Sequence, residues 1–265
     1  TPATRFWYNP AQTDFTTVTV NYTIQGDANF TFKARAYDMA KNPSEINSNN
    51  KVRVLIDTTP PVTEFSNYSI GTWANTSVKL WLNADCNISG CNWTKYNLSN
   101  DRTVPVISDE GGFYYYKTNG ILIAETNITT VAYHSQDLAS NKESVKYLKV
   151  KIDKKAPEFN ITEAAVTSPS GLIFGPYSTN GMTHYKTSDN KISIRGNFSD
   201  DLTRVIIFDA MDIANNASLD YDPVFLNGTF EINFTNLTVG MSTFTLKIQD
   251  EANNTQKIKL LLEYD

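Results

Sequence analysis

The chain has 265 residues and a formal charge of −5, and no run of Lys or Arg forms a basic stripe. This length allows two or three domains, while the charge argues against nucleic-acid binding. No apolar run approaches the roughly 18 residues of a membrane-spanning helix, so we expect no membrane insertion within this chain.

Apolar residues alternate with period two along most of the chain, and no helix is predicted. The stretch 168–180, rich in Ser, Gly and Pro, is expected to be a long loop. Short strands of this density are typical of an all-β fold built from β-sandwiches. The strands we predict are 16–24, 30–37 and 51–57; then 77–84, 92–98, 113–117, 127–135 and 144–153; then 158–162, 191–197, 204–210, 229–233, 242–249 and 257–263.

The motif Asp-x-Ala-x-Asn occurs three times, beginning at Asp38, Asp137 and Asp250, at intervals of 99 and 113 residues. A repeat at this period indicates tandem modules. The first two copies are followed by Ile-Asp and then proline, which stops strand pairing and favours a stiff hinge. We therefore expect domains at residues 1–59, 60–155 and 156–265. The first contains too few strands to close a sandwich, so it is expected either to be truncated at residue 1 or to be completed by a strand from a neighbouring subunit.

Several motifs of the second and third segments resemble a known family. They are Thr76-Ser77-Val78-Lys79-Leu80, Ser89-Gly90-Cys91, Thr94-Lys95-Tyr96 and Lys151-Ile152-Asp153; then Ile192-x-Ile194-x-Gly196, Val205-x-Ile207, Asn227-Gly228-x-Phe230 and Leu237-x-x-Gly240. These segments resemble Ig-like repeat domains of bacterial and archaeal cell-surface proteins, and the first is similar to the C-terminal half of a fibronectin-III-like domain. The resemblance implies tandem Ig-like antiparallel β-sandwiches joined by short Pro-containing hinges. In one departure, the family has Gly before the Asn of the repeated turn, where this chain has Lys41, Ser140 and Asn253.

Cys86 and Cys91 are the two cysteines of the chain. They lack the neighbouring Cys or His that zinc would need. We favour a small disulfide at a hairpin tip over two free thiols, and a disulfide implies an extracytoplasmic setting.

The sequon Asn-x-Ser/Thr occurs fifteen times, where 28 Asn and 50 Ser or Thr in 265 residues give about five by chance. In the predicted strands the sequon asparagines fall on the polar face, where a glycan needs them. We therefore expect a secreted or cell-surface protein that carries N-glycans. The candidate sites are Asn21, Asn29, Asn67, Asn75, Asn87, Asn92, Asn97, Asn127, Asn160, Asn197, Asn216, Asn227, Asn233, Asn236 and Asn253.

Calcium is the one metal that the sequence suggests, because Asp and Asn oxygens suit a hard cation. The acidic pairs Asp200/Asp201, Asp209/Asp212 and Asp220/Asp222 are the candidates in the third domain, although we favour the interpretation that they are solvated loop carboxylates. For the repeated turns we favour a structural interpretation, in which Asp and Asn hydrogen-bond the turn and Ala packs inward. No other cofactor is expected.

No catalytic motif is present, and His134 and His184 lie in different domains, so we do not expect an enzyme. The aromatic run 113–116 is interpreted as packing with one alternate pair inside, rather than as a binding patch. We expect a structural glycoprotein of an S-layer or extracellular filament that contacts copies of itself. The alternative is an adhesin stalk or spacer module that binds other surface proteins or glycans, through the long sequon-free stretches 102–126 and 163–195.

Overall fold

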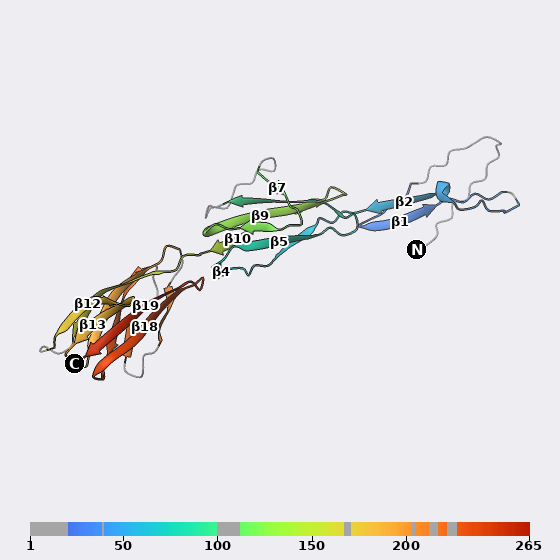
Figure 1. Ribbon diagram of the computed structural model, residues 1–265. Coiled ribbons are helices and arrows are strands. Elements are labelled where there is room, and N and C mark those ends of the chain that lie inside the picture. The colour runs from blue at the N-terminus through green and yellow to red at the C-terminus, as the bar shows by residue number, and fades with distance from the viewer. Residues whose placement is uncertain are drawn as a thin grey trace. The chain divides into compact units, whose positions relative to one another are not determined.

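A computed structural model describes residues 21–38, 40–99, 112–166, 171–202, 205–211, 217–221 and 227–265. It describes the backbone alone, without side chains, for residues 179, 205–211, 217–221 and 227. Figure 1 shows strands throughout, apart from one short helical turn. The fold is all-β, as predicted. The elements are β1 (Ala28–Lys33), η1 (Ser48–Asn50), β2 (Lys51–Ile56), β3 (Val62–Ser66), β4 (Trp73–Ala74), β5 (Val78–Asp85), β6 (Cys91–Ser99), β7 (Tyr114–Tyr115), β8 (Ile121–Ile123), β9 (Asn127–Asp137), β10 (Lys146–Ile152), β11 (Glu158–Val166), β12 (Ile173–Thr179), β13 (Met182–Thr187), β14 (Ile192–Ser199), β15 (Val205–Met211), β16 (Ala217–Tyr221), β17 (Asn227–Phe234), β18 (Gly240–Asp250) and β19 (Thr255–Tyr264).

The chain divides into two compact units, residues 1–59 with 87–89, and residues 60–86 with 90–265. In the first unit β1 and β2 form a two-stranded antiparallel sheet. One face of this sheet is apolar and open, with Phe32 39% and Val52 59% exposed. Of the predicted strand 16–24, residues 21–24 are not in a strand, and the rest lies outside the described residues.

The second unit contains two sandwiches, each with its own core. The first sandwich consists of the sheets β4-β10-β9-β6-β7 and β3-β5-β8. The second consists of the sheets β11-β14-β17-β16 and β12-β13-β19-β18-β15. Alternation places every second side chain in the core. Completely buried residues include Leu80, Val131 and Val150 in the first sandwich, and Ile194, Ile232, Leu246 and Leu260 in the second. Nearly all strand pairs are antiparallel; β4 with β10 and β13 with β19 are parallel.

The prediction of a long loop over 168–180 was wrong, because β12 occupies most of it and pairs with β13. Gly and Pro argue against a central strand, but β12 is an edge strand. Its pairing register shifts between Phe174 and Tyr177, around Pro176, as expected where a residue cannot donate to the ladder.

The three repeated Asp-x-Ala-x-Asn segments form the same turn. In the middle copy Asp137 Oδ1 accepts from Asn141 N at 2.8 Å and Oδ2 accepts from Asn141 Nδ2 at 2.8 Å. Asp38 and Asp250 make the same pair of bonds at 2.8 to 2.9 Å. The structural interpretation of these turns agrees with this geometry. The inward packing of Ala is found only at Ala252, which is 1% exposed; the alanines of the two earlier copies are exposed.

The residue before each Asn, where the repeats that the sequence resembles have Gly, has a left-handed backbone conformation. Lys41, Ser140 and Asn253 have φ of 67°, 73° and 68°, the left-handed region that Gly occupies without strain. The turn is therefore kept, at the conformational cost of a side chain in that region.

We predict that Ser140→Gly stabilises the chain by about 0.5–1 kcal/mol, because it removes this cost while the Asp137–Asn141 bonds remain. Thermal unfolding measures the change. Ser144→Gly is the matched control: Ser144 is exposed and has no positive φ, so added chain freedom should destabilise slightly. Equal losses for both variants would contradict the account.

Candidate functional site

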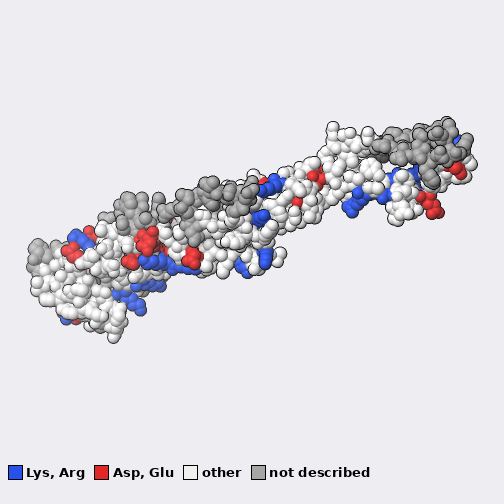
Figure 2. Space-filling view, turned by 90° about the horizontal axis from the view of Figure 1, so that it is seen from above, with Lys and Arg blue, Asp and Glu red and all other residues white. Residues whose placement is uncertain are grey.

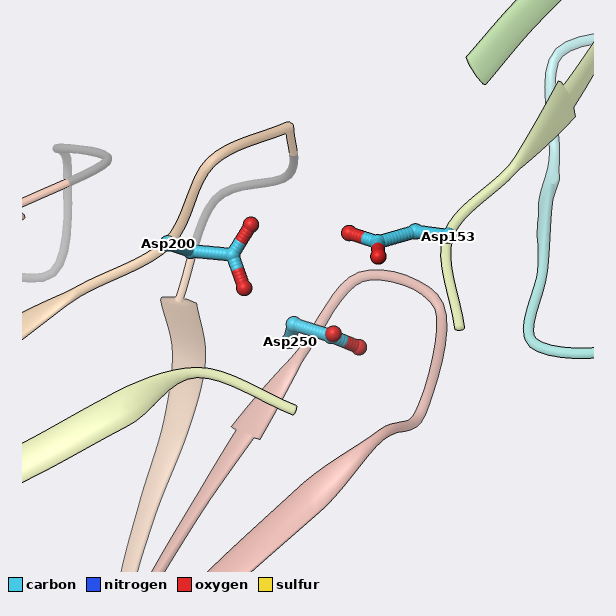
Figure 3. A group of neighbouring side chains, drawn as sticks. All are labelled: Asp153, Asp200 and Asp250. Carbon is cyan, nitrogen blue, oxygen red and sulfur yellow. The ribbon is translucent and has the colours of Figure 1, made fainter. Parts of the chain in front are cut away.

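Three carboxylates meet where the chain enters the last sandwich. Asp153 follows β10, Asp200 follows β14 and Asp250 ends β18. One oxygen from each lies within 4.8 Å of the others. Figure 3 shows the side chains converging from three separate segments of the chain. Asp153 is 1% and Asp250 2% exposed, and Asp200 is half-buried.

Backbone and amide donors hold each carboxylate in place. Asp153 Oδ1 accepts from Lys155 N at 3.0 Å, and Asp200 Oδ1 accepts from Leu202 N at 2.9 Å. Asn254 Nδ2 donates both to Asp250 Oδ2, at 2.8 Å, and to the main-chain oxygen of Asp153, at 2.9 Å. The amide of the repeated turn thus fixes the position of the linker that carries Asp153.

The cluster concentrates negative charge at two buried positions and one half-buried position. Burial raises the pKa of Asp250, and the nearby Asp153 and Asp200 raise it further, against the opposite effect of the Asn254 hydrogen bonds. Like charges at this separation repel more strongly in a protein interior than in bulk water. The ionised cluster therefore destabilises the fold unless positive charge neutralises it.

The donor set suits a hard cation. Three carboxylates supply only oxygen ligands, which calcium and magnesium prefer, and none of the nitrogen or sulfur ligands typical of zinc. Calcium takes six to eight oxygens, so three aspartates with waters can complete its shell. Asp153, Asp200 and Asp250 are the residues that would hold it.

Among the calcium candidates predicted from the sequence, the side chains of Asp200 and Asp201 are described, and Asp200 belongs to this cluster. Asp201 is 71% exposed and pairs with Lys155 at 2.8 Å. The side chains of Asp209 and Asp220 and the whole of Asp212 and Asp222 lie outside the described residues.

The sequence analysis did not include Asp153 and Asp250 among the candidate ligands. The sequence signal that could have found them is repetition: Asp153 belongs to the recurring Ile-Asp pair and Asp250 to the recurring Asp-x-Ala-x-Asn motif. Both residues lie at strand ends, where the chain enters the last sandwich.

The sequon asparagines whose side chains are described lie at the surface. Thirteen have a described side chain and none of these is buried; Asn216 and Asn227 fall outside that set. Asn97, Asn127 and Asn233 are half-buried. The exposed ones are Asn21, Asn29, Asn67, Asn75, Asn87, Asn92, Asn160, Asn197, Asn236 and Asn253.

The predicted disulfide between Cys86 and Cys91 is formed, with an S–S distance of 1.97 Å and a Cα separation of 5.1 Å. It joins the end of β5 to the start of β6.

The two histidines lie apart, in different sandwiches. His134 is 3% exposed and packs between the rings of Trp93 and Phe113, with centroids at 5.1 and 4.8 Å. It lies on the face of β9 away from the core residues Val131 and Tyr133, so it is buried on the outer side of its sheet. His184 Nε2 lies 3.1 Å from Glu263.

The aromatic run does not divide into alternate pairs as expected. Phe113 and Tyr116 pack, while the adjacent Tyr114 and Tyr115 are 64% and 63% exposed. Both lie in β7, a two-residue edge strand whose opposite faces are both open.

Sequence reasoning also missed a buried polar network in the first of these sandwiches. Glu143, 8% exposed, accepts from Thr63 N at 3.0 Å and from the Thr63 hydroxyl, and Lys146 Nζ lies 3.0 Å from its carboxylate. These contacts tie β3 to the segment before β10. No local motif marks them, because the partners are far apart in sequence.

Charged groups on the visible face in Figure 2 form small mixed patches, without a continuous basic stripe over the described atoms. Among the described residues, no helix has the length and apolar character needed to cross a bilayer.

No family model and no curated protein matches the chain. Among solved structures it is similar to the D00-D0 domain of intimin (TM-score 0.31, 8% identity, 77% of this chain and all of that one). It is also similar to domains 4 and 5 of the S-layer protein SbsC (TM-score 0.24, 11% identity, 77% and 98%) and to the Ig domains of a Dpr2–DIP-Theta complex (TM-score 0.29, 10% identity, 83% and 71%). These scores are too low to carry a functional argument.

We predict that Asp200→Asn stabilises the chain by about 1 kcal/mol in chelator, because it removes one of three repelling charges while its oxygen still accepts from Leu202. In wild type, 10 mM calcium should add about 2–3 kcal/mol for a Kd near 10⁻⁴ M, and the variant should lose most of this gain. Thermal unfolding with calcium or chelator measures both.

Asp201→Asn is the control, since it makes the same charge change on an exposed neighbour and should leave the calcium response intact. A wild type whose unfolding is indifferent to calcium would contradict the metal assignment. Equal behaviour of the two variants would contradict the assignment of the charge repulsion to this cluster.

Proposed function

We propose that the chain is a non-catalytic structural glycoprotein of the cell exterior, a subunit of an S-layer or extracellular filament. Three tandem β-modules, at residues 1–59, 60–155 and 156–265, would make the subunit long. N-glycans would form its outer coat. Calcium bound at Asp153 would stiffen the linker between the last two modules. The observation that carries the proposal is the position of the sequons on the strands.

Some sequon asparagines have a backbone reason to be Asn. Asn67, Asn87, Asn236 and Asn253 have positive φ, a conformation that Asn tolerates better than other side chains. Asn would be favoured at these four positions even in a protein without glycans, so they give the glycoprotein proposal only weak support.

The strand asparagines have no such reason. Asn29, Asn92, Asn160 and Asn197 lie within strands, where Asn is disfavoured, and all four are exposed. Asn29 also has a role within the fold, because its side chain accepts a hydrogen bond from Arg53 Nε at 3.0 Å. For Asn92, Asn160 and Asn197 we infer a function outside the fold. Covalent attachment of a hydrophilic glycan to an outward-facing amide is that function.

The Cys86–Cys91 disulfide supports the same compartment, because such bonds persist in oxidising environments. The adhesin or spacer alternative is favoured by one observation, the open pair Tyr114 and Tyr115 within the sequon-free stretch 102–126. Tyr is enriched at protein interfaces.

We predict that the protein purified from its natural cells carries a glycan on Asn160. In that host, Asn160→Gln should lower the intact mass by one glycan, and Thr162→Ala should lower it equally because the sequon hydroxyl is lost. Mass spectrometry of the intact chain and its glycopeptides measures both. Asn50→Gln, outside any sequon, serves as the control. Unmodified peptides at Asn29, Asn92, Asn160 and Asn197 alike would sink the glycoprotein proposal.

A further inference from the structure

An open groove lies at one side of the last sandwich, between the edge strands of its two sheets. β11 is an edge strand of one sheet and β12 of the other, and both line the groove together with the turn between β12 and β13. The groove has a volume of about 490 Å³, and small-molecule sites have roughly 300–1,000 Å³. No residue of the carboxylate cluster is among the described residues that line it. The groove is therefore a second candidate site, separate from that cluster.

The lining of the groove combines apolar rings with polar groups. From β12 it includes Pro176 and Tyr177, which are both exposed, Tyr177 by 50%. From β11 it includes the sequon residue Asn160, Ile161 and the buried ring of Phe159. A sugar matches this lining, because the C–H face of its ring packs against an aromatic or proline ring while its hydroxyl groups hydrogen-bond polar atoms.

An extended peptide matches the groove less well, because both edge strands are irregular beside it. The pairing register of β11 shifts between Ile161 and Glu163, and that of β12 shifts between Phe174 and Tyr177. Such irregularities disrupt the ladder, and Pro176 has no N–H to donate. A strand from another chain would therefore find neither edge ready for regular pairing. The groove favours an occupant that does not need main-chain hydrogen bonds.

Asn160 is positioned to supply such an occupant. Its side chain is exposed on an edge strand and lines the groove. Across β11 and β14 it lies directly opposite Asn197, which also belongs to a sequon. Directly opposite residues have Cβ atoms about 5 Å apart, so two glycans there would compete for the space over the sheet. The glycan of Asn160 is the one beside the open edge, and the groove is the space available to it.

We propose that this groove binds the N-glycan of Asn160, whose first sugar residues pack against Tyr177 and Pro176. The asparagine holds the glycan at the groove covalently, and a short flexible tether gives an effective concentration on the order of millimolar. Contacts too weak to capture a free sugar therefore suffice for this one. The bound glycan would bridge the two sheets of the sandwich at their open side. This inference deepens the proposed function and rests on it, because it requires a glycan on Asn160.

Hydroxyl-radical footprinting of the full chain from its natural cells tests the contact, because it measures how fast individual side chains are oxidised from the solvent. Wild type is compared with Asn160→Gln made in the same cells. Tyr177 should be oxidised more slowly in wild type, where the glycan covers it. A groove occupied half of the time would halve the rate, so we expect a slowing of about twofold or more.

Phe174 is the internal control for this measurement. It lies on the same strand as Tyr177 and has nearly the same exposure, 51% against 50%, but it is not among the described residues that line the groove. Its oxidation rate should be the same in wild type and in Asn160→Gln. Thermal unfolding of both proteins checks that the variant keeps its fold.

Tyr177→Ala tests the contact from the side of the groove. This variant also loses the ring contact of Tyr177 with His184, with or without a glycan. In the glycosylated chain it should lower the unfolding temperature by about 2–4 °C more than in the Asn160→Gln background, because only there does it also lose the contact with the sugar. Equal lowering in the two backgrounds would contradict the contact.

Two footprinting results would overturn the inference: a Tyr177 rate that does not change when the glycan is lost, or equal changes at Tyr177 and Phe174, which would indicate a loose cover over the whole edge. Glycopeptide mapping of the same samples separates them from a failure of the proposed function. A glycan on Asn160 with an unchanged Tyr177 rate refutes the groove contact and leaves the glycoprotein proposal standing. An Asn160 without glycan also refutes the groove contact, and the glycoprotein proposal fails with it only if Asn29, Asn92 and Asn197 are unmodified as well.

Discussion

The structure depends on a carboxylate that accepts two N–H groups from an asparagine four residues later. In the copies at Asp137 and Asp250 this turn follows a strand of 11 residues, β9 and β18 respectively. The copy at Asp38 lies in the segment between β1 and β2. In all three copies the residue immediately before the asparagine is left-handed. Lys, Ser and Asn fill that position at a conformational cost, so the hydrogen-bonded turn outweighs it. In the copy at Asp250 the next strand, β19, starts directly after Asn254, so this turn also fixes which residues of β19 face the core.

The copy at Asp250 connects this turn to the linker. Asn254 bonds both Asp250 and the main chain of Asp153, which brings a second buried carboxylate beside the first. Burial raises the pKa of Asp250, and the neighbouring charges of Asp153 and Asp200 raise it further, so the ionised cluster is unfavourable without a counter-ion. The hydrogen bonds of Asn254 hold this junction together, while the repulsion between the three carboxylates opposes them. A cation bound there would therefore stabilise the junction.

Patterns in short stretches of the sequence were sufficient to predict the fold class, the disulfide and the repeated turns. Strand alternation predicted the all-β fold, a five-residue spacing predicted the disulfide, and the chemistry of Asp and Asn predicted the turns. Composition failed at β12, since a strand at a sheet edge can hold Gly175 and Pro176 where a central strand cannot. The contact of Glu143 with Thr63 and the convergence of Asp153, Asp200 and Asp250 join residues that are distant in sequence, and periodicity carries no information about such pairs. Tyr114 and Tyr115 escaped the alternation rule because an edge strand of two residues leaves both faces open.

The strand sequons and the disulfide together lead to the central claim, that this chain works outside the cell. Electron cryo-tomography of intact cells that make the protein, with gold-conjugated antibody against the chain, tests it most directly. We predict label on the outer side of unpermeabilised cells, arranged in a layer or along filaments. Label that enters only after permeabilisation would place the chain inside the cell and contradict the account.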